Sequence, residues 1–217
     1  MDTGKSMFKL TYFDIQGRAE PARCMFAYAG CRYEDERISY EEWPSRKSLT
    51  PFGKLPVLED SGIEICQSTT INRYLAKKFN LFGKDEKESL LIDMVCECCY
   101  DMVKPLEKFE CISSKDIEGK MKDYREKELP DLLKNLENLA KKYGSKGHFV
   151  GNRMSLADIL FYNTFDYGIR TFYQVCDSSC LKNYEHLQGI CEEVKSNGNI
   201  AKWLNKRPVD QYKFVRT

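Results

Sequence analysis

The stretch that decides the fold is Lys9-Leu10-Thr11-Tyr12-Phe13-Asp14-Ile15-Gln16-Gly17-Arg18-Ala19-Glu20. Apolar and polar residues alternate from Phe8 to Tyr12, which is the periodicity of a half-buried strand. The pattern breaks at Gly17, and a helix is predicted with Pro21 in its first turn, where a missing N–H costs nothing. A phenol and the guanidinium of Arg18 are therefore predicted where a strand meets a helix. They could be a core tyrosine and a helix-capping arginine, or part of a functional site.

The following residues extend this start into a small α/β domain. The first helix is expected to end at Gly30, and a short exposed strand over residues 33–38 would pair parallel to the first strand. A further strand starts after Pro56, turns over residues 60–62 and returns over residues 63–66. Ser68 is predicted to cap the next helix, and residues 80–85 to link two domains.

From residue 86 onward the pattern is helical, with no convincing strand. Pro105 is predicted to bend or end a first long helix, and Pro130 to bend a second. Ser155-Leu156-Ala157-Asp158 has the form of a capping box with Asp in place of the usual Glu. The sequence therefore predicts an α/β domain over residues 1–83 and an all-α domain over residues 84–217.

Charge and hydropathy argue against several classes of function. Among 217 residues, 34 Lys and Arg balance 33 Asp and Glu and do not cluster, so no nucleic-acid partner is expected. No apolar run approaches the ~18 residues of a membrane span, and the polar start at residues 1–6 has no secretory pattern. We expect a cytoplasmic protein without a membrane partner.

Ten cysteines leave a choice between free thiols and redox or zinc chemistry. Cys96 and Cys99 form a Cys-x-x-Cys, but within a helical pattern and not at a helix N-terminus, where a redox cysteine would have a lowered pKa. Cys176 and Cys180 form a Cys-x-x-x-Cys. Buried free thiols are the default interpretation, and no metal requirement is expected.

Several motifs in one order resemble those of a known family. They are Lys9-Leu10-Thr11-Tyr12-Phe13, Gly17-Arg18-Ala19-Glu20, Trp43-Pro44, Pro51-Phe52-Gly53-Lys54-Leu55-Pro56, Gln67-Ser68, Arg73-Tyr74-Leu75, Gly151-Asn152 and Ser155-Leu156-Ala157-Asp158. Together they cover nearly the whole chain and resemble the cytosolic glutathione transferases, most closely the sigma class, which includes the haematopoietic prostaglandin D synthases. The resemblance implies a thioredoxin-like domain, β-α-β-α-β-β-α, followed by an all-helical domain, and a homodimer.

The resemblance also implies a site for glutathione as co-substrate. Its catalytic residues would be Tyr12, which donates a hydrogen bond to the glutathione sulfur, and Arg18, which adds positive potential. The other glutathione-binding positions would be Trp43, Lys47, Gly53, Lys54, Leu55, a cis Pro56, Gln67, Ser68 and, from the neighbouring subunit, Asp101. Taken singly, Lys47, Lys54 and Asp101 could be surface charges, an interpretation favoured for Lys47 and Asp101, and Gln67-Ser68 could be merely a helix cap.

The implied chemistry is stabilisation of a thiolate. A free thiol with a pKa of ~8.5 is only a few per cent ionised at pH 7, and the thiolate is the nucleophile. Donors that stabilise the anion by ~2.7 kcal/mol lower that pKa by about two units. The implied reaction is conjugation of glutathione to small hydrophobic electrophiles in detoxification.

The sequence departs from the family's pattern in the pocket for the second substrate, the electrophile. Phe13, Met102, Val103 and Leu106 are predicted to line it. Prostaglandin synthases of the class carry a tryptophan where Lys108 stands here, which disfavours prostaglandin isomerisation. A non-catalytic ligand carrier and a glutaredoxin-like redox enzyme are the remaining alternatives. Retained Tyr12 and Arg18 argue against the carrier, and the absence of a cysteine at Tyr12 or Phe13 argues against the redox enzyme.

Overall fold

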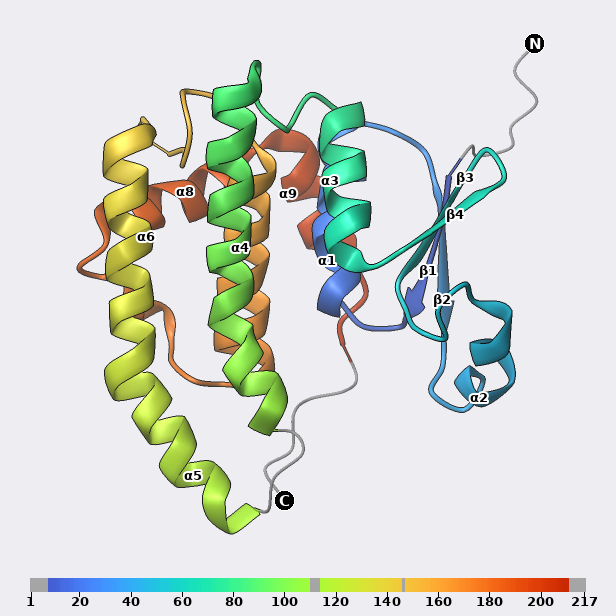
Figure 1. Cartoon of the computed structure of the whole chain (residues 1–217), viewed down its shortest axis with the longest axis horizontal. Coiled ribbons are helices and arrows are strands. Elements are labelled where there is room, and N and C mark those ends of the chain that lie inside the picture. The colour runs from blue at the N-terminus through green and yellow to red at the C-terminus, as the bar shows by residue number, and fades with distance from the viewer. Residues whose placement is uncertain (1–7, 110–113, 146, 211–217) are drawn as a thin grey trace. The chain divides into compact units, whose positions relative to one another are not determined.

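The computed structural model describes residues 8–109, 114–145 and 147–210. By their contacts these residues form two compact units, one built from residues 8–79 and 197–210 and one from the described residues between 80 and 196. Each unit is described by itself (Figure 1).

The first unit contains one mixed four-stranded sheet in the order β2-β1-β3-β4. β1 pairs parallel to β2 and antiparallel to β3, and β3 pairs antiparallel to β4. The predicted strand, helix and strand, and the hairpin after them, are confirmed. The elements of this unit's first 79 residues are β1 Phe8–Phe13, η1 Gly17–Ala19, α1 Glu20–Ala29, β2 Glu34–Ile38, α2 Trp43–Arg46, η2 Lys47–Leu49, β3 Val57–Asp60, β4 Ile63–Cys66 and α3 Ser68–Lys78.

The two faces of this sheet have different partners because side chains alternate along β1. Phe8 packs edge-on against Phe26 of α1 and Phe79 after α3, with ring centroids 5.3 and 6.3 Å apart. Leu10 and Tyr12 share that face, and both are buried. Figure 1 shows α1 and α3 on one side of the sheet and α2 on the other. Tyr12 therefore belongs to the face that α1 covers.

Helix boundaries in the first unit follow local sequence signals, with one correction. α1 has proline in its first turn and ends at Gly30, whose φ of 61° is the left-handed conformation expected of a C-terminal glycine. The prediction that Ser68 caps α3 is wrong by one residue. Ser68 is already helical, and Gln67 is the cap, with its carbonyl accepting from the Ile71 N–H at 2.9 Å.

The second unit is helical, and its bounds exclude one of the two effects predicted for Pro105, which were to bend or to end its helix. α4 continues through Pro105 to Phe109, so the proline does not end it; Met102 and Leu106, on either side of Pro105, are fully buried. A π-helical segment, Tyr124–Glu128, lies just before Pro130, where the sequence predicts a bend. The elements are α4 Glu86–Phe109, α5 Ser114–Asp123, η3 Tyr124–Glu128, α6 Leu129–Tyr143, α7 Leu156–Asn163, η4 Thr164–Phe172, η5 Ser178–Leu181 and α8 Glu185–Ser196.

Two buried carboxylates tie this unit together. The predicted capping box is confirmed: Asp158 accepts from the Ser155 N–H at 2.8 Å and from the Phe149 N–H at 2.8 Å. Glu137 of α6, 4% exposed, accepts from the backbone N–H groups of His186 and Leu187 in the first turn of α8, at 3.3 and 3.1 Å. A negative charge placed there meets free N–H groups and the positive end of the helix dipole.

The Glu137 contacts predict a dependence of stability on pH. Burial alone would raise the pKa of Glu137, but bonds from Leu187, His186 and Lys141 outweigh it and hold the pKa below its ordinary value of 4.5. A carboxyl with a lowered folded-state pKa contributes stability above pH 4.5, and this is lost as the pH falls through the lower value. Glu137→Ala should lower the free energy of unfolding at pH 7 by roughly 2–3 kcal/mol.

The measurement is urea unfolding at pH 7 and at pH 3.5, with the exposed neighbour Asn138→Ala as control. The Glu137→Ala deficit should shrink at the lower pH, because pH 3.5 lies below the ordinary pKa of 4.5 and the carboxyl of the unfolded wild type is then mostly protonated. A deficit that is equal at both pH values would show that packing, not the charge, accounts for it.

The last helix, α9 Gly198–Lys206, groups by contacts with the first unit, whereas the sequence assigns residues 84–217 to one helical domain. The reason is a polar contact between residues far apart in the chain. Glu20 of α1, fully buried, accepts a hydrogen bond from the Trp203 indole N–H at 2.8 Å and pairs with Arg207 at 3.0 Å. The described chain from residue 197 onward is therefore part of the surroundings of α1.

The nine described cysteines are free thiols, and Cys24, Cys96, Cys99 and Cys191 are buried. Cys111 lies outside the described residues. In the described ranges, no three His, Cys, Asp or Glu side chains gather as metal ligands would. None of the helices in those ranges combines the length and the apolar character that crossing a membrane requires.

Candidate functional site

Tyr12 lies near the end of β1, and its hydroxyl is held by the loop that follows. The Tyr12 oxygen accepts a hydrogen bond from the Arg18 backbone N–H at 3.2 Å, and the side chain is only 7% exposed. Because the oxygen is the acceptor in this bond, the phenolic hydrogen stays available for donation to another group. The structure thus presents Tyr12 as a buried, oriented donor.

The electrostatics of Tyr12 keep the phenol neutral. Burial raises the pKa of Tyr12, and this outweighs the opposing effects of the Arg18 N–H and of the Arg18 and Arg23 charges. A phenol with a raised pKa keeps its proton at pH 7 and can donate a hydrogen bond to an anion without transferring the proton. This is the state needed for stabilising a neighbouring thiolate.

Gly17 makes the closest approach to this hydroxyl. A Cβ at Gly17 would lie 2.7 Å from the Tyr12 oxygen and 2.9 Å from its Cε1, and Gly17 has a φ of +44°. Both facts favour glycine, which alone lacks a Cβ and adopts positive φ without strain. The sequence indicated Gly17 as a turn but gave no sign that its backbone packs against the phenol.

Phe13 joins an aromatic cluster in the first unit. Its ring stacks on Tyr40 with centroids 4.4 Å apart and meets Trp43 and Tyr12 edge-on, each at 5.7 Å. Trp43 is partly exposed. The sequence singled out Phe13 and Trp43 but missed Tyr40, which carries no motif signal.

The loop before β3 holds the expected backbone conformation. The Leu55–Pro56 peptide bond is cis, as expected. Lys47 and Gly53, both predicted glutathione ligands, are close together: the Lys47 Cε lies 3.7 Å from the position of a Cβ on Gly53. Lys47 and Lys54 are exposed.

The N-terminus of α3 presents Gln67 and Ser68. Gln67 has a φ of 72°, a strained conformation that costs a residue other than glycine about 1–3 kcal/mol, and residues strained in this way cluster at functional sites. Ser68 is buried at the first helical position of an eleven-residue helix. The free N–H groups of this first turn suit a carboxylate.

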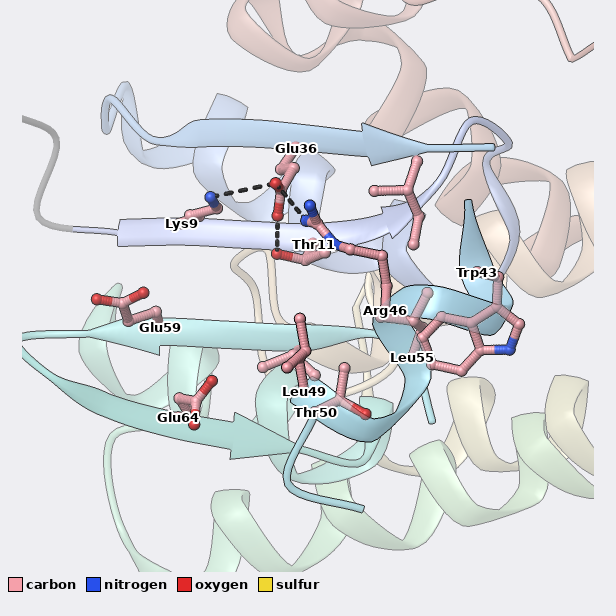
Figure 2. Close-up of a pocket in the computed structure, with 12 residues that line it drawn as sticks. Lys9, Thr11, Glu36, Trp43, Arg46, Leu49, Thr50, Leu55, Glu59 and Glu64 are labelled. Atoms are coloured by element: carbon pink, nitrogen blue, oxygen red, sulfur yellow. Dashed lines mark hydrogen bonds and ion pairs between the residues drawn. The ribbon is translucent and has the colours of Figure 1, made fainter. Parts of the chain in front are cut away.

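A separate cavity of about 180 Å³ lies between the outer face of the sheet and the α2–η2 segment. Figure 2 shows Lys9, Thr11 and Arg46 converging on Glu36. Glu36 accepts from Thr11 at 2.8 Å and from Arg46 at 2.6 Å, and Lys9 lies 3.3 Å away. Trp43 and Leu55 line the cavity, but Tyr12 does not, because it points to the opposite face of β1.

The predicted site residues of the second unit lie on α4. Asp101 is exposed and pairs with Lys104 at 2.7 Å. Met102 and Leu106 are fully buried, and the Met102 carbonyl accepts from the Tyr124 hydroxyl at 2.5 Å. Val103 is partly exposed. Their assignment to an electrophile pocket stays a prediction.

Comparisons with known proteins agree with both halves of the chain. A family model described as the N-terminal domain of glutathione S-transferase matches residues 8–77, and one described as its C-terminal domain matches residues 101–207. The chain is 35% identical over 211 residues to a probable glutathione S-transferase 7 of Caenorhabditis elegans, covering 94% of this chain and 98% of the relative. It is 34% identical over 209 residues to the hematopoietic prostaglandin D synthase of Gallus gallus, covering 93% and 96%. Among solved structures it resembles a sigma class transferase of Fasciola hepatica, with a TM-score of 0.83, 26% identity and coverage of 94% and 98%.

Proposed function

Because the chain belongs to the glutathione S-transferase family and is a transferase enzyme of that fold, we propose that Tyr12 activates glutathione for attack on apolar electrophiles. The observation that carries the proposal is the Tyr12 hydroxyl, buried, neutral and fixed by the Arg18 N–H at 3.2 Å. Its proton is directed to the bound sulfur, and the resulting bond stabilises the thiolate form.

Glutathione would be held along the carboxyl end of β1 and its neighbours. The γ-glutamyl carboxylate would bind at Gln67, Ser68 and the N-terminus of α3, where free N–H groups favour an anion. The cysteinyl residue would pair with the backbone of Leu55 before cis Pro56, as an added strand. Trp43, Lys47, Gly53 and Lys54 would hold the glycyl carboxylate. The first 83 residues would thus bind glutathione.

The remainder of the chain, residues 84–217, would contribute the electrophile pocket through Met102, Val103 and Leu106, with Phe13 from the first domain.

We also propose a homodimer in which the partner subunit's Asp101 reaches the γ-glutamyl amine. Two apolar side chains of α4 support this, since Leu90 is 69% exposed and Met94 37% exposed, one helical turn apart. Sedimentation at micromolar concentration tests the dimer, and a monomer there would remove this role of Asp101. We further propose that the enzyme acts in detoxification in the cytoplasm.

The first test is binding and turnover by the purified protein. It should be retained on immobilised glutathione, be eluted by free glutathione, and conjugate a chloronitrobenzene substrate. Retention is expected from the tripeptide site, and conjugation from the lowered thiol pKa. A protein that binds glutathione but conjugates nothing in a broad electrophile panel would be a carrier of the same fold.

Prostaglandin isomerisation is the second candidate, because one of the similar proteins is named as a hematopoietic prostaglandin D synthase. The exposed Lys108 at the position of the pocket tryptophan disfavours it. Incubation with prostaglandin H2 and analysis of the products decides between the two candidates. Selective formation of the D product, without conjugation of electrophiles, would favour the isomerase.

A further inference from the structure

The loop over residues 14–18, here called the tyrosine loop, is held by polar groups from both ends of the chain. The Gln16 backbone N–H donates to both carboxylate oxygens of Asp210, at 2.9 and 3.2 Å. Asp210 lies four residues after the end of α9. A charged acceptor makes a stronger bond than a neutral one, so this contact fixes the position of the loop backbone.

The loop's carbonyl groups are held by Arg23 of α1. Its Nη1 donates to the Ile15 carbonyl at 2.7 Å and to the Gln16 carbonyl at 3.3 Å. Arg23 is itself fully buried, and its Nε donates to Asp35 of β2 at 3.0 Å. A buried guanidinium with these partners has little freedom to move, so the two carbonyl groups are fixed with it.

Arg23 is in turn linked to α9 through Glu20. One oxygen of the buried Glu20 carboxylate lies 3.4 Å from Arg23 Nη1, and the other accepts from Trp203 at 2.8 Å and from Arg207 at 3.0 Å. Trp203, Arg207 and Asp210 are thus separated by 183 to 194 positions in the sequence from the residues that they contact, Glu20 and Gln16. No sequence motif joins these segments.

The tyrosine loop touches the phenol of Tyr12 directly. Arg18 donates its N–H to the hydroxyl, Gly17 packs against it, and the Arg23 guanidinium lies 5.9 Å from the ring centroid. A displacement of the loop would therefore turn or release the hydroxyl, and a hydrogen bond weakens steeply as its geometry departs from the optimum.

We propose that Asp210 and Trp203 are positioning residues for glutathione activation, acting through the tyrosine loop and Glu20 on the Tyr12 hydroxyl. This inference rests on the proposed role of Tyr12. The segment from α9 to Asp210 would set the angle at which Tyr12 donates to the bound thiol, without touching glutathione itself.

The test compares Asp210→Ala, Asp210→Asn and Trp203→Phe in the full chain, with Val209→Ala as control because Val209 is 88% exposed. The bound-glutathione thiol is titrated by its thiolate absorbance, and kcat and the KM for glutathione are measured at pH 6.5. Asp210→Ala and Trp203→Phe should raise the pKa of the bound thiol by about 0.5 to 1, equivalent to roughly threefold to tenfold less thiolate well below the pKa. The KM for glutathione should change less than twofold. Asp210→Asn keeps one acceptor oxygen, so the pKa of the bound thiol in this variant should stay close to that of the wild type.

The possible results distinguish the positioning role of Asp210 and Trp203 from the proposed role of Tyr12 in stabilising the thiolate. A thiol pKa unchanged in both Asp210→Ala and Trp203→Phe, while Tyr12→Phe raises it, overturns the positioning role alone. An unchanged pKa in Tyr12→Phe as well overturns both proposals. Thermal unfolding shows whether Trp203→Phe folds. If it does not, Asp210→Ala and Asp210→Asn alone test the positioning role, because Asp210 is partly exposed and lies outside the helices, so its variants are expected to fold.

Discussion

Tyr12→Phe should raise the pKa of the thiol of bound glutathione by about two units, from roughly 6.5 to the value of ~8.5 that a free thiol has. The substitution removes only the hydroxyl, and the ring that packs beside Phe13 remains. At pH 7 the thiolate fraction then falls about 25-fold. A more basic thiolate is intrinsically more nucleophilic, with a Brønsted slope of about 0.4–0.5, which returns part of the loss. The conjugation rate should therefore fall between about threefold and 25-fold at pH 7.

The pH dependence is the sharper part of this result. The wild-type thiol is ionised well below pH 8, whereas the thiol in Tyr12→Phe ionises only near pH 8.5, so the defect in rate should be largest at pH 6 and shrink steadily as the pH rises. Glutathione affinity should stay nearly unchanged, because other groups hold the peptide. Tyr28→Phe, which removes the hydroxyl of a partly exposed tyrosine on α1, is the matched control. Equal thiol pKa values in the wild type and in Tyr12→Phe would contradict thiolate stabilisation by this residue.

Local signals in the sequence predicted much of the first unit. Strand alternation ends at Phe13, a glycine ends α1, and a turn signal at residues 60–62 joins β3 to β4, and each depends on neighbours in the chain. The positive φ of Gln67 could not be predicted, because side chains other than glycine rarely adopt it, so the start of α3 was placed one residue off. The family motifs supplied the candidate residues of the site but not the distances between them.

The long-range polar contacts of α1 could not be predicted. Glu20 and Arg23, three residues apart on a helix, have the spacing of a solvated surface pair, yet both are fully buried. Their burial is possible because Trp203, Arg207 and backbone carbonyl groups supply partners from distant segments. The sequence assigned α9 to the helical domain, and the C-terminal family model over residues 101–207 also includes it, although by its contacts α9 groups with α1.

Gly17→Ala should reduce activity at least as strongly as Tyr12→Phe. The added Cβ would lie 2.7 Å from the Tyr12 oxygen and 2.9 Å from Cε1, closer than any ordinary contact, so the phenol or the loop must move. Either movement breaks the hydrogen bond from the Arg18 N–H and misdirects the phenolic hydrogen. The positive φ adds a backbone cost of about 1 kcal/mol to folding. Gly30→Ala is the matched control, because Gly30 has a φ of +61° and nothing within 4 Å of its Cβ position.

The decisive measurement is a double-mutant cycle between Gly17→Ala and Tyr12→Phe. If Gly17 acts by making room for the hydroxyl, the alanine should cost less activity in Tyr12→Phe than in the wild type, because the closest clashing atom, the oxygen at 2.7 Å, is absent and only the ring contact at 2.9 Å remains. Both alanine variants should lose similar backbone stability, and only Gly17→Ala should raise the pKa of the bound thiol. An additive cycle, with Gly17→Ala equally harmful beside phenylalanine, would mean that the glycine shapes the loop for Arg18 or for glutathione and not for the Tyr12 hydroxyl.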